Sequence, residues 1–270
     1  MMRLKIPFQL TMVTVVCLIS VSFKQEVSFA TADTLDGSGS VTVTGSDHTK
    51  PIDPENPGTT VDPGESPNTT GPLRIDYVSA LNFNKAIIKK NERTYEALAQ
   101  QFFDETEPRG SYIQITDQRG SSTGWTLQVK QNTQFHNPVI QKQEEQTLVG
   151  AYLSLDKGWA NSSGDSQAPT VTRETIGLNA INTAYEVATA SPGTGRGVWT
   201  IAFGASEANS NQQSATLKPL KDSDGKAVID EVYKKPAYTN SAVSLTIPES
   251  TKIYPVQYET EITWILAKLP

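Results

Sequence analysis

The chain has 270 residues, of which 37% are hydrophobic and 19% charged, and its formal net charge is −6. This length is enough for one sizeable core, so we expect one domain with an extension. Without residues 1–30 the chain keeps 20 basic and 28 acidic side chains, a net charge of −8. An acidic chain with no basic cluster argues against nucleic acid as a partner, and against simple charge attraction to anionic lipid or teichoic acid.

Residues 1–30 have the three parts of a secretory signal peptide. A start with two basic side chains precedes the apolar run 6–21, and small residues then allow cleavage after Ala30, with Ala32 as a close alternative. An uncleaved membrane anchor is the other interpretation, but the apolar run is short for a membrane span. The single cysteine, Cys17, lies in this run, so the secreted form would have no disulfide and no thiol chemistry.

Residues 31–72 change sharply to Thr, Ser, Gly, Asp and Pro. This composition has too little apolar surface to offset the entropy of ordering, so it predicts a disordered N-terminal tail. The tail is either a spacer that holds the folded domain away from the membrane or threads the wall, or a segment with no selected role.

Residues 73–270 read as one all-β domain. Short stretches alternate between apolar and polar residues, and loops rich in Gly, Asn, Ser and Pro separate them, a pattern typical of a β-sandwich or barrel. Only at 91–103 could a short helix form. The predicted strands are centred on 73–77, 113–115, 125–129, 153–155, 199–203, 243–247 and 258–266.

Two of these strands share a Trp-x-Leu pattern. In the first, Trp125 and Leu127 fall on one face, and in the second Tyr258, Trp264 and Leu266 also share a face. The two Trp-x-Leu pairs are therefore expected either to meet or to line neighbouring parts of one surface.

These two strands resemble the signature motifs of the WxL-domain surface proteins of Gram-positive bacteria. The resemblance covers residues 71–270 and includes the intervening segments 71–83, 117–120, 148–155 and 243–248. It implies non-covalent attachment to the cell wall with peptidoglycan as the ligand, and other surface proteins, some of them membrane-anchored, as partners. It also implies a wall- or partner-binding role for Trp125, Leu127, Tyr258, Trp264 and Leu266.

The tryptophans allow two interpretations. A Trp on the apolar face of a strand is usually a core residue, because its burial removes a large apolar area from water. Alternatively, the indole faces lie in a shallow groove and stack on sugar rings. We expect both Trp125 and Trp264 to be needed for binding, either directly or by holding the binding surface.

The sequence contains little enzyme or metal chemistry. A catalytic triad would depend on His136 without any motif that names the serine. The carboxylate pairs Glu144/Glu145 and Glu259/Glu261 are better explained as solvated charges than as a glycosidase pair. Asp222, Asp224, Gly225 and Glu231 match positions 3, 5, 6 and 12 of a calcium loop, but the first ligand position is Leu220.

The sequence therefore predicts a secreted, extracellular, cell-wall-associated protein with no cofactor, no metal and no catalysis. After signal cleavage no membrane span remains, and no sortase signal is present, so attachment is expected to be non-covalent. The alternative is a structural component of a multi-protein surface complex whose Trp-x-Leu face docks another surface protein. A wall hydrolase would need two carboxylates that face one cleft.

Overall fold

The structure is a computed structural model, and it describes residues 48–91, 93–120 and 123–270. The predicted signal peptide and residues 31–47 of the predicted tail lie outside the described residues. Every described strand belongs to one compact unit, Ser46–Pro270. Within the described ranges, no helix is both long and apolar enough to cross a membrane.

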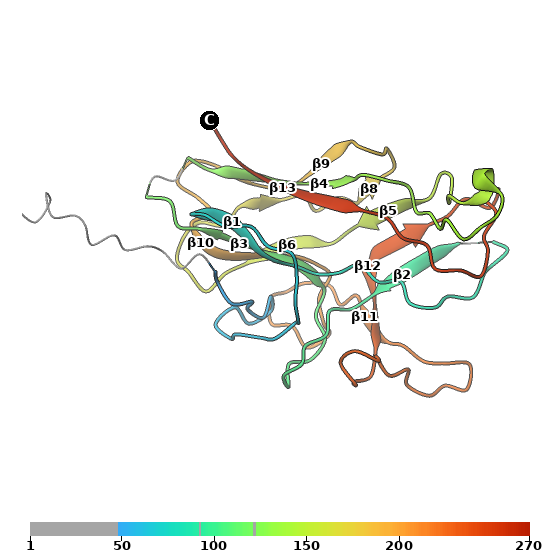
Figure 1. Cartoon of the computed structure of the whole chain (residues 1–270). Helices are drawn as coiled ribbons and strands as arrows, with labels where there is room; N and C mark the ends of the chain where they lie inside the picture. Colours follow the sequence, from blue (N-terminus) through green and yellow to red (C-terminus); the bar gives the residue numbers. More distant parts are fainter. Residues whose placement is uncertain (1–47, 92, 121–122) are drawn as a thin grey trace, which may run out of the picture. The chain divides into compact units, whose positions relative to one another are not determined.

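Three antiparallel sheets make up this unit (Figure 1), and each is named here after one of its strands. The β3 sheet has the order β1 (Leu73–Val78), β3 (Ser111–Asp117), β10 (Gly197–Phe203), β6 (Gly158–Asn161). The β4 sheet has the order β13 (Ile262–Lys268), β4 (Trp125–Gln131), β9 (Ala184–Ala190), β7 (Thr170–Val171). The β12 sheet has the order β11 (Leu217–Pro219), β12 (Tyr238–Thr246), β5 (Tyr152–Leu155), β8 (Ile176–Leu178), and β2 (Thr94–Leu98) also pairs with β12.

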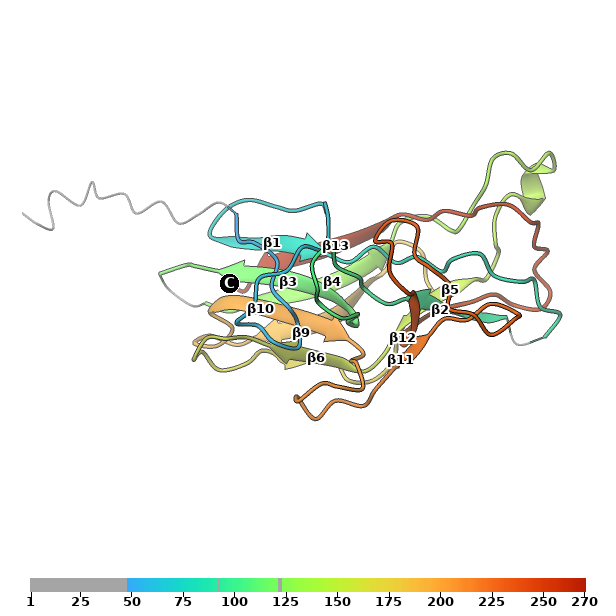
Figure 2. The same ribbon diagram turned by 90° about the horizontal axis from the view of Figure 1, so that it is seen from below.

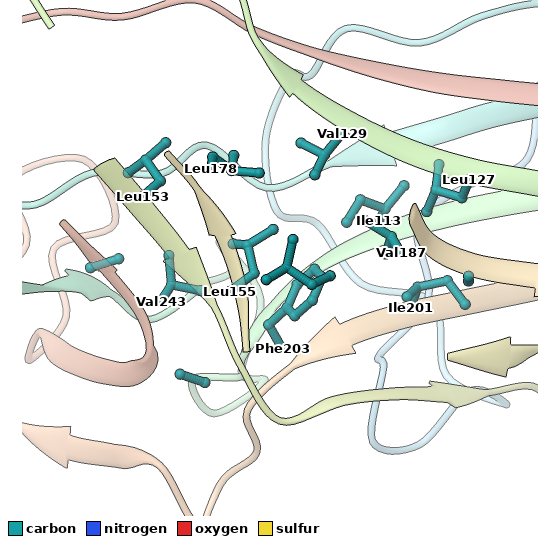
Figure 3. Packing of buried hydrophobic residues seen from close by; sticks show 14 of the residues in the cluster. Ile113, Leu127, Val129, Leu153, Leu155, Leu178, Val187, Ile201, Phe203 and Val243 are labelled. Atoms are coloured by element: carbon teal, nitrogen blue, oxygen red, sulfur yellow. The ribbon is translucent and has the colours of Figure 1, made fainter. Parts of the chain in front are cut away.

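The three sheets share one apolar core, and the predicted all-β, sandwich-like fold is confirmed. Strands that alternate in sequence bury every second side chain, as β4 does along its whole length. Figure 3 shows Phe203 between residues of the β12 sheet and residues of the other two sheets. Full burial of a side chain of this size contributes about 1.5–3 kcal/mol. The core therefore joins the sheets into one domain.

The helix considered for 91–103 is wrong, because this stretch forms β2, which pairs with β12. Its sequence, Thr-Tyr-Glu-Ala-Leu, contains good helix formers. Ala97 is nevertheless fully buried in the core, so pairing and packing decide the conformation. The one helical element of the described chain is the 3₁₀ turn η1 (Gln143–Glu145).

The folded unit begins earlier than the predicted boundary at residue 72. Residues 48–72, predicted as part of a disordered tail, follow a defined path along the β3 sheet. Gln114 projects from β3 and accepts a hydrogen bond from the Ile52 N–H (2.8 Å), while its amide donates to the Lys50 carbonyl (3.1 Å). Further along, the Ser66 hydroxyl bonds the backbone of Val78 on β1. Polar side chains of the sheet thus order a segment that has little apolar surface of its own.

A buried ion cluster fastens the same segment. Arg109 donates to both carboxylate oxygens of Asp53, at 2.8 and 2.9 Å, and its Nε lies 3.5 Å from Glu55. Glu55 in turn accepts bonds from the Ser206 N–H and hydroxyl, each at 2.6 Å. Nearby, Val61 enters a second apolar cluster. Charge pairing and apolar contact therefore both hold this segment to the domain.

Acid should loosen this attachment. Burial raises the pKa of Asp53, but hydrogen bonds from Arg109, Asn56 and the Glu55 N–H outweigh it and hold the pKa below its usual value. A lowered native pKa stabilises the fold above the unfolded pKa of about 4, and this stabilisation is lost as pH falls through the native value. We therefore expect the free energy of unfolding, measured by urea titration, to decrease as the pH falls from about 4 through the native pKa of Asp53. In Asp53→Asn this part of the pH dependence should disappear, and an unchanged pH profile would contradict the assignment.

Candidate functional site

The two Trp-x-Leu strands lie side by side. β13 pairs antiparallel with β4 in a register that places Leu266 opposite Leu127 and Trp264 opposite Val129. Directly opposed residues of an antiparallel pair share a face, so both Trp-x-Leu pairs occupy one face of the β4 sheet. Of the two arrangements that the sequence left open, the structure shows the one in which the pairs meet.

Trp125 and Leu127 belong to the core. Both are 0% exposed, and the indole N–H of Trp125 donates to the Gly195 carbonyl at 3.0 Å. A side chain without accessible surface contacts no ligand directly. For this first pair the structure shows core packing and not a groove that receives sugar rings.

Two glycines make room for Trp125. Gly195 has a φ of +70°, and a Cβ there would lie 2.5 Å from the Ala190 Cβ and 2.9 Å from the indole nitrogen. Gly124, directly before the tryptophan, has a φ of +83°, and a Cβ there would lie 2.3 Å from the Ala190 carbonyl oxygen. Both positions need a left-handed backbone and no side chain, so glycine alone fits.

The second pair is only half-buried. Trp264 and Leu266 pack against the core, and the Trp264 ring lies 6.5 Å from the Phe203 ring, centroid to centroid. Tyr258 also packs there, and its hydroxyl accepts a bond from the Tyr254 N–H at 2.9 Å. It precedes β13, because the regular strand begins at Ile262 and not at residue 258 as predicted. Of the five predicted binding residues, Tyr258, Trp264 and Leu266 keep accessible surface.

β13 is an edge strand, and among the described residues no strand pairs with its outer side. The Asn132 N–H donates to the Glu261 carbonyl and the Leu269 N–H to the Gly124 carbonyl. Hydrogen-bonded pairs alternate along an antiparallel ladder, so the backbone groups of Ile262, Trp264 and Leu266 point away from β4. The half-buried Trp264 and Leu266 thus sit beside a row of free backbone donors and acceptors, called here the β13 edge.

The sequence did not reveal the β13 edge. Alternation in 258–266 shows which side chains share a face, but the strand's neighbours follow from pairings across the whole domain. The edge of β1 illustrates the contrast. There the Thr69 N–H donates to the Ile75 carbonyl, and the Ile75 N–H donates to the Thr69 hydroxyl, so the extra segment covers the strand.

The other candidate groups have structural partners. Glu145 accepts hydrogen bonds from the Tyr254 hydroxyl and from Lys252, and these lower its pKa to about 2, which is unsuited to a general acid. His136 and Glu259 exchange backbone hydrogen bonds at 2.9 and 3.0 Å, and both residues are exposed.

The suggested calcium loop forms a turn. The Asp222 carboxylate accepts bonds from the N–H groups of Asp224 and Lys226, both at 2.9 Å. The part of the chain that the structure describes holds no group of three or more His, Cys, Asp or Glu residues arranged for a metal ion.

The described chain is thus an all-β domain whose last strand pairs the two Trp-x-Leu motifs. A family model described as "WxL domain surface cell wall-binding" matches residues 30–270. The chain belongs to this family, and its domain is a cell-surface, cell-wall-binding domain. Comparisons with curated proteins and with solved structures found no match.

Substitution of Gly195 by alanine should disturb the Trp125 pocket. The methyl group would collide with Ala190 and the indole, and the left-handed backbone adds strain, so we expect a loss of about 2–4 kcal/mol in unfolding free energy. Gly193→Ala is the matched control, since Gly193 has a φ of +89° but nothing within 4 Å, and it should cost only about 1 kcal/mol. Equal losses in urea titrations would show that the pocket is not tight.

Proposed function

We propose that this protein is secreted and non-enzymatic and that it attaches non-covalently to peptidoglycan through the β13 edge. The observation that carries the proposal is the position of the second Trp-x-Leu pair. The chain belongs to a cell-wall-binding family, and this pair is half-buried beside backbone N–H and C=O groups that no described strand pairs with. The fully buried first pair supports the surface from below and does not touch the ligand.

The chemistry of the β13 edge suits a glycan with peptide side chains. An indole face packs well on the C–H groups of a sugar ring, and its N–H can donate to a hydroxyl. The outward N–H and C=O groups of Ile262, Trp264 and Leu266 can bond hydroxyls, acetamido groups or an extended peptide stem. Catalysis is not part of the proposal, because Glu145 is paired with two lysines and the other three candidate carboxylates, Glu144, Glu259 and Glu261, are exposed.

Binding to a repeating polymer also tolerates a weak site. Many copies on one wall raise the effective concentration, so retention can exceed the affinity of a single domain by orders of magnitude. A shallow edge is therefore compatible with stable attachment.

The test is sedimentation of residues 31–270 with purified peptidoglycan that has been stripped of teichoic acid and protein. Trp264→Ala should lower the affinity by about tenfold or more, as expected when an anchor aromatic is removed. Ile265→Ala is the matched control, since Ile265 is half-buried on the opposite face of the same strand.

Thermal melts separate binding from folding in this test. If Trp264→Ala loses binding only to the extent that it loses stability, or if Ile265→Ala loses as much, Trp264 is a packing residue alone. Failure of the unmodified chain to sediment with stripped wall would contradict peptidoglycan as the ligand.

A second function, docking of another surface protein, is favoured by the β13 edge itself. An exposed edge strand is a template for an added strand from a partner, and such pairing gives affinity through main-chain hydrogen bonds. In this case the protein is a structural component of a multi-protein surface complex and reaches the wall partly through its partners.

A proline placed on the β13 edge tests strand addition. The Leu266 N–H points outward, so Leu266→Pro removes one edge donor without removing a bond to β4. Leu266→Ala is the control for the lost packing. For strand addition we expect retention on walls that still carry their proteins to fall several-fold further in Leu266→Pro than in Leu266→Ala, with no such difference on stripped walls. Equal retention of the two variants on both walls would contradict docking at this edge.

A further inference from the structure

The loop between β1 and β2 carries an exposed apolar tip. Residues 84–91 are all exposed, and within them Ile87 and Ile88 are 85% and 43% exposed. Figure 2 shows this loop beside β2, at the same end of the unit as η1. Two adjacent isoleucines on a projecting loop contribute nothing to the core, so their apolar surface is available to something outside the chain.

The same loop is positively charged. Segment 84–93 has four basic residues and one acidic residue, whereas the remainder of 31–270 carries a net charge of −11. Lys85 lies two positions before Ile87, Lys89 and Lys90 directly follow Ile88, and all three lysines are exposed. The expectation that the chain has no basic cluster is therefore wrong at this loop. The small positive charge of the loop does not show in the net charge of the chain, because the other residues are acidic overall.

The base of the loop is fixed to the domain. Arg93 donates to the carbonyls of Pro248 and Thr251, at 3.1 and 2.6 Å, and to the Lys89 carbonyl at 2.9 Å. On the other side, the Phe83 ring packs edge-on against Phe135, with centroids 6.5 Å apart. The loop thus presents its isoleucines and lysines from an anchored base.

Neighbouring loops extend the apolar character of this end. Val139 and Val149 are 78% and 63% exposed, and the Thr251 hydroxyl, next to the Arg93 anchor, donates to the Val149 carbonyl at 2.6 Å. A hollow of about 370 Å³ at Val139 is lined by Val139, Ile140, Gln141, Lys142, Tyr254, Pro255 and Val256. Of the acidic residues at this end, Glu145 is paired with Lys142 and Lys252, whereas Glu144 and Glu249 are exposed.

We propose that loop 84–91 is a peripheral membrane contact that binds the surface of an anionic lipid bilayer. Ile87 and Ile88 enter the boundary between headgroups and acyl chains, while Lys85, Lys89 and Lys90 reach the lipid phosphates. Apolar side chains flanked by lysines are the combination that an anionic interface binds, because burial and charge attraction act together. An anionic wall polymer would use the lysines but would leave the isoleucines in water. The lipid surface therefore accounts for both features, and the contact is separate from the β13 edge.

The test is co-sedimentation of residues 31–270 with vesicles of equal parts phosphatidylglycerol and phosphatidylcholine, compared with phosphatidylcholine alone. Residues 1–30 are omitted because their apolar run would itself bind lipid. We expect binding to the anionic vesicles that weakens at high ionic strength. Replacing the three lysines by Gln should lower the partition coefficient on the order of 100-fold, and Ile87→Ser with Ile88→Ser by about tenfold.

Matched controls lie in the segment 217–235. Ile229→Ser with Val232→Ser removes two exposed apolar side chains, and Lys218→Gln, Lys221→Gln and Lys226→Gln removes three exposed lysines. Both control proteins should bind the vesicles as the parent does. Unchanged binding of the isoleucine variant would overturn the proposal in favour of charge attraction alone, and absence of binding to anionic vesicles would overturn it outright. Sedimentation with stripped peptidoglycan should be unaffected by every loop variant.

Discussion

Leu127 and Leu266 face each other across β4 and β13, and much of the domain depends on this contact. The pairing period of two residues puts both Trp-x-Leu pairs on the inner face of the β4 sheet, where they meet the core. A shift of one residue in this register would turn Trp264 and Leu266 outward and expose Leu127. The Trp-x-Leu motifs therefore first serve to pair β13 with β4. The accessible surface of Trp264 and Leu266 is a consequence of this pairing.

The N-terminal segment of the unit follows a different physical rule. It adds little apolar area, and its order comes from Arg109, Gln114 and Ser206, whose buried polar groups need partners. Without Asp53 and Glu55, the Arg109 charge would be buried and unpaired. The sheet and the segment therefore depend on each other. Each supplies hydrogen-bond or ion-pair partners for buried polar groups of the other, which would otherwise be buried without a partner.

The sequence predicted the strands that alternate clearly, such as β4, where every second residue is buried. It did not identify β2, whose Glu96, Ala97 and Leu98 also suit a helix, because pairing with β12 overrides local propensity. It also misplaced the start of the domain, since composition measures apolar content and not the hydrogen bonds that order residues 48–72. The sequence left open whether the two motif pairs meet, and their unequal burial depends on β4 being central and β13 at the edge, which is a property of the complete topology.

The distance along the chain between the two motif strands has a kinetic consequence. Ile262 pairs with Gln131, so half of the β4 sheet is assembled from segments separated by most of the domain. Loop closure over such a span is slow, and long-range pairing dominates the folding times of β proteins. When the chain is made from its N-terminus, Trp125 and Leu127 on β4 lack their neighbouring strand until β13, the last strand, is available. The domain therefore stays open until its last strand has been made, and it acquires the β13 edge in the same step that completes its core.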